Sequence, residues 1–136
     1  VREVKSYTFI EDCYNANPDS MKASLITLNT IKKTRSIAVL GDMLELGDYS
    51  DTAHYEVGKI AGDVKTDIVL TFGNLSRLIK KGAEENGAES YSFNDKGELI
   101  SFLKSILKEK DTVLFKGSRS MKMEEIFHEL YKEWEV

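Results

Sequence analysis

The 136-residue chain has one cysteine, one proline and no long hydrophobic run. A single cysteine cannot form a disulfide within the chain, which is typical of proteins in a reducing compartment, so we expect a cytoplasmic location. The longest apolar runs, such as residues 37–40, have the length of a strand and are far too short to span a bilayer. We therefore expect neither an internal disulfide nor a membrane segment.

The chain also lacks an excess of basic residues. Its 23 Asp and Glu outnumber its 19 Lys and Arg, which gives a formal net charge of -4 with neutral histidines. No cluster of Lys and Arg is interleaved with aromatic residues, so nucleic acid is not an expected partner. The hydrophobic share of 41% and the charged share of 31% are ordinary for one globular domain of this length.

Three sequence motifs of nucleotide and acyl-transfer chemistry are absent. There is no Gly-x-x-x-x-Gly-Lys-Ser/Thr, so the chain has no P-loop of its own. There is no Gly-x-Gly-x-x-Gly after a strand and no Gly-x-Ser-x-Gly elbow. His54 and His128 are far apart, without Cys or Asp at ligand spacing, so we expect no metal site. His54 follows the apolar Ala53 and is expected at the surface or facing a turn, and His128 is expected to be exposed. If the chain takes part in a reaction, we expect it to supply only part of the active site.

The sequence does contain a regular alternation of short apolar runs and helix-period segments. Five strand-helix units with nearly continuous apolar strands predict an α/β fold. This fold is a Rossmann-like, doubly wound, mostly parallel sheet with helices on both faces. Residues 1–4 are predicted to add an antiparallel edge strand. The predicted main strands are residues 7–10, 36–40, 68–72, 90–93 and 111–116, and the helical stripes lie at residues 21–31, 53–64, 75–83, 99–107 and 123–134.

Three polar turns are expected at the carboxyl edge of this sheet, where α/β proteins bind ligands. They are residues 11–17, 41–47 and 116–119. Together they supply carboxylates, amides, a hydroxyl and two cations. Such groups can orient a small zwitterion or part of a nucleotide through charge-assisted hydrogen bonds.

Each of these residues also has a structural interpretation. Asn17, before the only proline, is typical of a helix N-cap, and Asp42 is typical of a turn cap. Cys13 is expected to be a partly buried, unreactive thiol. Lys116 and Arg119 fit solvated charges and ligand-binding cations equally well.

The order and spacing of these motifs resemble the Mur ligase family, most of all its dipeptide-adding members. The resemblance is carried by residues 12–21, by residues 38–47 with His54 and Glu56 downstream, and by residues 116–119. It implies an ATP-dependent, peptide-bond-forming ligase of three domains in peptidoglycan precursor synthesis. Residues 1–136 resemble the C-terminal domain alone, without the N-terminal UDP-sugar domain and the central P-loop domain.

The resemblance also implies the substrates and the part that each residue plays. ATP and Mg²⁺ would be held mainly by the central domain, while the amine of D-alanyl-D-alanine attacks the activated carboxylate of UDP-N-acetylmuramoyl-tripeptide. Asp12 would face the ATP ribose, and no catalytic residue or metal ligand is expected in this domain alone. The residues that would line the substrate site are Tyr14, Asn15, Asn17, Asp42, Glu45, His54, Lys116, Ser118 and Arg119.

Two alternatives of other classes remain open at this point. A phosphoacceptor receiver domain would use Asp42 as the accepting carboxylate and Lys116 as its lysine, with Glu11 and Asp12 in an acidic pocket. Receiver domains place the accepting aspartate after their third strand, whereas Asp42 follows the second main strand here. The other alternative is a Rossmann-like binding module without catalytic activity.

Overall fold

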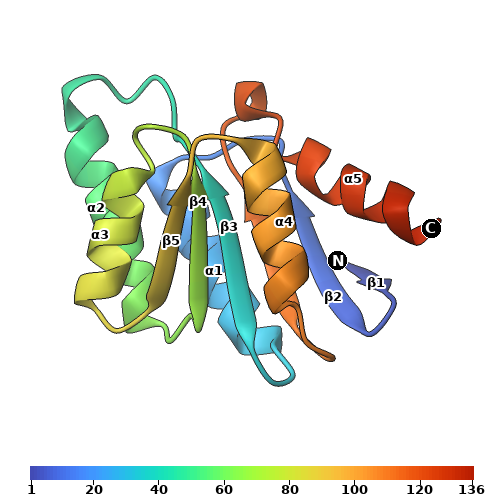
Figure 1. Ribbon diagram of the computed structural model, residues 1–136. Coiled ribbons are helices and arrows are strands. Elements are labelled where there is room, and N and C mark those ends of the chain that lie inside the picture. Colours follow the sequence, from blue (N-terminus) through green and yellow to red (C-terminus); the bar gives the residue numbers. More distant parts are fainter.

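The computed structural model describes residues 1–136 and contains one six-stranded sheet covered by five α-helices (Figure 1). The strand order is β1-β2-β6-β3-β4-β5, and every neighbouring pair is parallel except β1 and β2. The strands are β1 (Arg2–Val4), β2 (Tyr7–Asp12), β3 (Ser36–Gly41), β4 (Ile68–Phe72), β5 (Glu89–Phe93) and β6 (Thr112–Lys116). The helices are α1 (Pro18–Ile31), α2 (Ser50–Asp63), α3 (Arg77–Glu85), α4 (Lys96–Ile106) and α5 (Glu124–Trp134), with short 3₁₀ turns η1 (Gly47–Tyr49) and η2 (Arg119–Met121).

The predicted α/β fold is confirmed, and so is the antiparallel edge strand at the start of the chain. Arg2 pairs with Phe9 and Val4 with Tyr7 in an antiparallel register. Lys5 adopts a left-handed backbone conformation, with φ of 52°, in the tight turn that joins the two strands. The remaining strands form the parallel part of the sheet. A helix after each of β2, β3, β4 and β5 returns the chain to the start of the next strand, and α5 follows β6.

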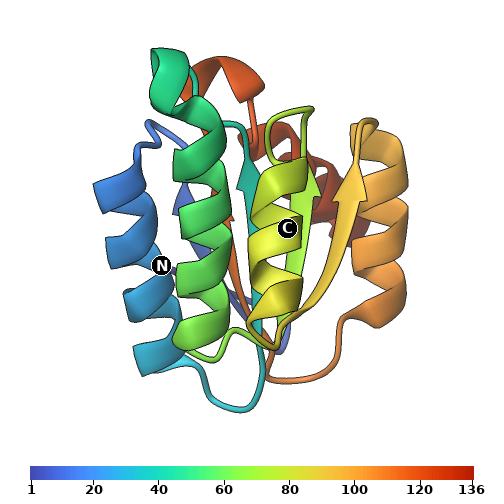
Figure 2. The same ribbon diagram turned by 90° about the vertical axis from the view of Figure 1, so that its left-hand side faces the viewer.

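The two faces of the sheet are covered by different helices. Helices α1, α2 and α3 lie side by side over one face, as Figure 2 shows, while α4 and α5 cover the other. Consecutive residues of β3 alternate between the two cores: Ala38 and Leu40 pack with the first layer, Ile37 and Val39 with the second. A strand that is buried on both faces needs apolar side chains on both, which explains its unbroken hydrophobic sequence.

Helices α2 and α3 approach each other closely through glycines. A Cβ atom on Gly58 would lie 2.0 Å from the backbone oxygen of Ile79, and one on Gly82 would lie 2.2 Å from the backbone oxygen of Tyr55. Both distances are too short for real atoms, so the two backbones touch only because these positions lack a side chain. This contact was not anticipated from the sequence.

No helix combines the length and the apolar character that a membrane crossing requires.

Candidate functional site

The three polar turns meet at one edge of the sheet because strands β2, β6 and β3 are adjacent and parallel. Their carboxyl ends lie at the top of the molecule in Figure 1, where the β2–α1 turn, the β3–α2 loop and the β6–η2 turn come together. The predicted convergence of the three segments is therefore confirmed. What each side chain does there differs from residue to residue.

An ion pair joins the first turn to the last strand. Lys116 is directly opposite Asp12 in the β2–β6 register, and its Nζ donates to Asp12 Oδ2 at 2.8 Å and to the backbone oxygen of Asn15 at 3.0 Å. Ser24 Oγ donates to the same Asp12 oxygen at 2.7 Å. The Lys116 side chain is 3% exposed, against 39% for Asp12. Lys116 therefore holds the turn in place, and Asp12 keeps a partly open face for a partner.

Asn17 and Cys13 adopt the structural roles that were expected of them. Asn17 Oδ1 accepts from the Ser20 N–H at 2.8 Å, and Ser20 Oγ accepts from the Asn17 N–H at 3.0 Å, which forms a capping box at the start of α1. The Cys13 thiol donates to the backbone oxygen of Phe115 at 3.5 Å. Its burial, with a further contribution from Glu124, raises the pKa of Cys13 to about 12, so the thiol is unreactive.

Asp42 does not face the ligand side of the second turn. It is 6% exposed, and its Oδ1 accepts from the backbone N–H of Ser76 at 2.8 Å and from the hydroxyl of Ser76 at 2.6 Å. Gly73 packs so tightly against this carboxylate that a Cβ there would lie 2.4 Å from Oδ1. Asp42 thus ties the end of β3 to the β4–α3 turn, and the structure does not bring it together with the other expected lining residues.

His54 is completely buried and faces the β3–α2 turn, so the turn-facing position is found and the surface position is wrong. The β3–α2 loop folds back over the first turn of α2 and covers the ring. His54 Nε2 accepts from the backbone N–H of Met43 at 2.9 Å, and Nδ1 lies 2.7 Å from the backbone oxygen of Ser50. The hydrogen is therefore assigned to Nδ1, which donates to Ser50. His54 can act on a ligand only through the loop that it supports.

A solvent-open hollow of about 490 Å³ lies between the second and third turns. Arg119 reaches it from η2, and its guanidinium stacks 5.2 Å from the ring centre of the exposed Tyr14. Ser118 Oγ accepts from the backbone N–H of Leu44 at 2.8 Å, which ties the two turns together. The complete lining is Asn15, Leu44, Glu45, Ser118, Arg119, Ser120 and Lys122.

The hollow unites four of the expected lining residues, Asn15, Glu45, Ser118 and Arg119, with Tyr14 beside them. Lys122 was missed by the sequence analysis. It lies three residues beyond Arg119 and reaches the hollow because the chain turns sharply there, with a left-handed φ of 50° at Lys122 itself. The lining thus carries one carboxylate and two cations, which is the charge pattern that complements a zwitterion.

Comparison with known proteins identifies the family. The model of the family described as "Mur ligase, glutamate ligase domain" matches residues 1–119. The chain belongs to the Mur ligase family. The curated UDP-N-acetylmuramoyl-tripeptide--D-alanyl-D-alanine ligases of Bacillus subtilis and Escherichia coli are 39% and 36% identical to it, over 90% and 96% of this Mur ligase chain. The chain spans 28% of the length of each of these relatives.

Solved structures of the same family have the same fold. The MurF ligase of Thermotoga maritima in complex with ADP superposes on this chain with a TM-score of 0.81 and is 28% identical to it. The superposition covers 98% of this chain and 30% of the Thermotoga maritima chain. A MurF structure from Acinetobacter baumannii gives a TM-score of 0.85 at 29% identity, over 96% of this chain and 29% of that one.

The receiver alternative is not favoured in this Mur ligase chain. Its would-be phosphoacceptor Asp42 is buried against Ser76, and its lysine, Lys116, is paired with Asp12 instead. Glu11 accepts from the hydroxyl of Tyr131. The three carboxylates thus have separate partners, and no group of three or more His, Cys, Asp or Glu is arranged to hold a metal ion.

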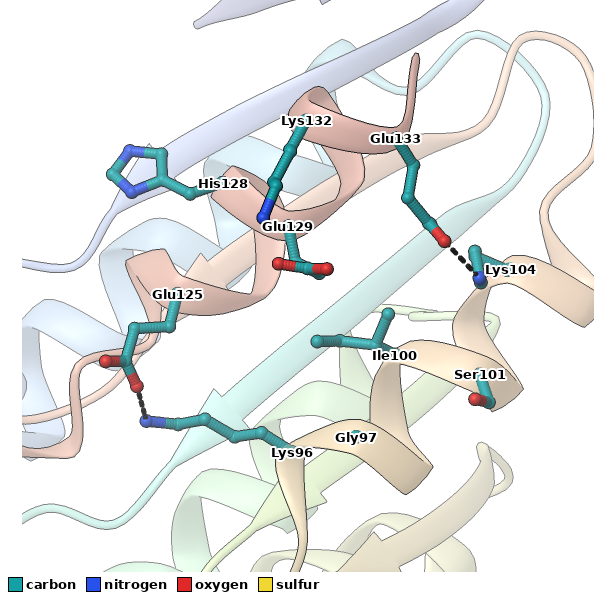
Figure 3. A pocket seen from close by; sticks show the side chains of 10 residues that line it. All are labelled: Lys96, Gly97, Ile100, Ser101, Lys104, Glu125, His128, Glu129, Lys132 and Glu133. Carbon is teal, nitrogen blue, oxygen red and sulfur yellow. Dashed lines mark hydrogen bonds and ion pairs between the residues drawn. The ribbon is translucent and has the colours of Figure 1, made fainter. Parts of the chain in front are cut away.

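A larger groove of about 680 Å³ lies elsewhere, between α4 and α5 (Figure 3). Two ion pairs bridge it, Lys96 with Glu125 at 2.7 Å and Lys104 with Glu133 at 2.9 Å. Ile100 is the only apolar residue in its lining. The charged side chains of this groove are paired with one another at the surface, where ion pairs contribute little even to stability, and they indicate no particular ligand. The smaller hollow at the sheet edge is therefore the candidate site.

Proposed function

We propose that this chain is the C-terminal, dipeptide-receiving domain of a UDP-N-acetylmuramoyl-tripeptide:D-alanyl-D-alanine ligase. The observation that carries the proposal is the hollow at the carboxyl edge of the sheet, which combines the carboxylate of Glu45 with the cations Arg119 and Lys122. D-alanyl-D-alanine is a zwitterion that needs one group of each kind. The names of the curated relatives support this choice of dipeptide.

The complete ligase would join two substrates at the expense of ATP. Transfer of the γ-phosphoryl group to the tripeptide carboxylate makes an acyl phosphate. The dipeptide amine then attacks the acyl carbon, the new amide bond forms, and inorganic phosphate leaves. ATP and Mg²⁺ would be bound mainly outside this chain, since it contains no P-loop. The requirement for ATP favours a cytoplasmic location.

The dipeptide would be oriented by its two charges. Arg119 offers two parallel N–H donors to the terminal carboxylate, with Lys122 as a second cation, and Ser118 lies within the same lining. Glu45 would hold the ammonium group at the other end until the amine loses its proton for attack. Holding the amine near the acyl phosphate makes the attack effectively intramolecular, which in well-oriented cases lowers the barrier by about 7–11 kcal/mol.

The first turn would serve the nucleotide rather than the dipeptide. Asp12 accepts from Lys116 and Ser24 through Oδ2 and is 39% exposed, so it can accept a further hydrogen bond from an ATP ribose across the interdomain cleft. Tyr14 and Asn15, both exposed, and the partly buried Asn17 would line the same cleft. Closure of the cleft would also exclude water from the acyl phosphate.

The test is the amine specificity of the complete ligase. Purified enzyme is incubated with ATP, Mg²⁺ and UDP-N-acetylmuramoyl-tripeptide, and each of D-alanyl-D-alanine, D-alanine, L-alanine and D-glutamate is added separately. Phosphate release and the mass of the product are measured. We expect product with D-alanyl-D-alanine alone. Efficient addition of a single amino acid in place of the dipeptide would refute the proposed specificity.

A further inference from the structure

The β3–α2 loop has a backbone conformation that its own sequence does not favour. Glu45 lies in the left-handed region, with φ of 64°, two residues before Gly47, which has φ of 60°. Glycine adopts this region freely, whereas a residue with a Cβ atom does so at a cost. A strained residue of this kind persists only where neighbouring contacts determine its position. Glu45 also lines the hollow at the sheet edge.

Hydrogen bonds from outside the loop hold the two residues that precede Glu45. The Met43 N–H donates to His54 Nε2 at 2.9 Å, and the Leu44 N–H donates to Ser118 Oγ at 2.8 Å. The Ser118 N–H returns a bond to the backbone oxygen of Asp42 at 3.0 Å. Two consecutive amides are thus fixed by side chains of α2 and of the β6–η2 turn, directly before the strained glutamate.

His54 is suited to this task by its burial and its position on α2. The ring has no exposed surface, and its Nδ1 donates to the backbone oxygen of Ser50 one helical turn earlier. That bond fixes both the ring orientation and the tautomer, which leaves Nε2 as an acceptor aimed at Met43. An apolar residue could fill the same space, but it would leave the buried Met43 N–H without a partner.

We propose that His54 is a positioning residue for recognition of the incoming amine substrate. It accepts the Met43 N–H and thereby holds Glu45 in its left-handed conformation, with the carboxylate at the hollow. The substrate side of this inference rests on the proposed function; the bond from Met43 to His54 does not. His54 itself does not touch the substrate, since it is completely buried.

Two substitutions at His54 distinguish the contributions of the two ring nitrogen atoms. His54→Gln places an amide oxygen near the position of Nε2 and keeps an acceptor for Met43, whereas His54→Asn reproduces only the Nδ1 donor for Ser50. His128→Asn is the matched control, because His128 is the only other histidine and is exposed on α5. All variants are made in the complete ligase.

We expect His54→Asn to raise KM for D-alanyl-D-alanine by about tenfold, with KM for ATP within about twofold of wild type, as for loss of one hydrogen bond in the dipeptide site. His54→Gln should recover most of this loss, and His128→Asn should match wild type. If both His54 variants keep the wild-type dipeptide KM, or if both raise it equally, the acceptor role is refuted and His54 is a packing residue.

Hydrogen exchange measured by mass spectrometry tests the positioning step without any substrate. Peptides that contain Met43 and Leu44 should exchange faster in His54→Asn than in His54→Gln or wild type. Equal exchange in all three proteins would overturn the proposal even if the dipeptide KM changed. If the wild-type ligase accepts another amine, the proposed dipeptide function fails, and the KM comparison is made with that amine.

Discussion

Arg119 is the residue whose removal should separate the proposed dipeptide binding from the other properties of the proposed ligase. Its side chain is exposed and stacks on the ring of Tyr14. Arg119→Ala therefore costs the fold only the exposed cation–π contact, about 0.5–1 kcal/mol. Loss of a charge-assisted bond to the dipeptide carboxylate costs about 1.5–3 kcal/mol, which corresponds to roughly a ten- to hundredfold increase in KM.

The assay is steady-state kinetics of the complete ligase, with D-alanyl-D-alanine varied at saturating ATP and then the reverse. We expect KM for the dipeptide to rise and KM for ATP to change by less than about twofold. Arg119→Lys should recover only part of the loss, because an ammonium keeps the charge without the two-pronged geometry. Arg77→Ala, at an exposed position on α3, is the control. An unchanged dipeptide KM together with a lower Tm would make Arg119 a structural residue and refute this reasoning.

Four further outcomes are expected. Asp12→Asn in the complete ligase should lower kcat/KM for ATP by about ten- to a hundredfold, and an unchanged value would make Asp12 only a turn residue. The isolated chain should show no Mg²⁺-dependent ATP turnover in a phosphate-release assay, because it has no P-loop. Gly58→Ala should destabilise the chain by about 1–3 kcal/mol in urea unfolding, whereas Gly97→Ala, whose Cβ meets nothing closer than 3.5 Å, should not. Burial raises the pKa of Cys13 from 9.0 to about 12, so the thiol should be alkylated at pH 8 about a thousandfold more slowly in the folded than in the urea-unfolded chain, and equal rates would contradict the burial. Because the pKa is higher in the folded chain, the contribution of this thiol to the free energy of unfolding is fully present below pH 9 and declines between pH 9 and 12.

The features that could be predicted from the sequence depend on neighbours along the chain. The apolar run of β3 indicated a strand buried on both faces, and Asn17 before Pro18 indicated the start of α1. Parallel strands share one carboxyl edge, so the meeting of the three turns followed from the fold class alone. Asn15, Glu45, Ser118 and Arg119 could therefore be expected near one another, and all four line the hollow.

The features that escaped prediction depend on partners far away in the sequence. Asp42 is bonded to Ser76, 34 residues later, so nothing near Asp42 indicates that its carboxylate is already occupied. The burial of His54 depends on how the β3–α2 loop folds back, and that path is set in part by Ser118. The roles of the substrate-lining residues stay predictions until ligand binding is measured.

The glycine contact between α2 and α3 also bears on how the ligase could move. Because the two backbones touch, no side chains lie between them to rearrange, so α2 and α3 resist sliding and behave as one rigid unit. His54 belongs to this unit, and the loop that contains Glu45 is hydrogen-bonded to it through the Met43 N–H. Under the proposed function, a rigid-body rotation of this domain would carry the Glu45 carboxylate toward the acyl phosphate together with α2 and α3. The accuracy of the final approach would then depend on the hinge between domains rather than on loop flexibility.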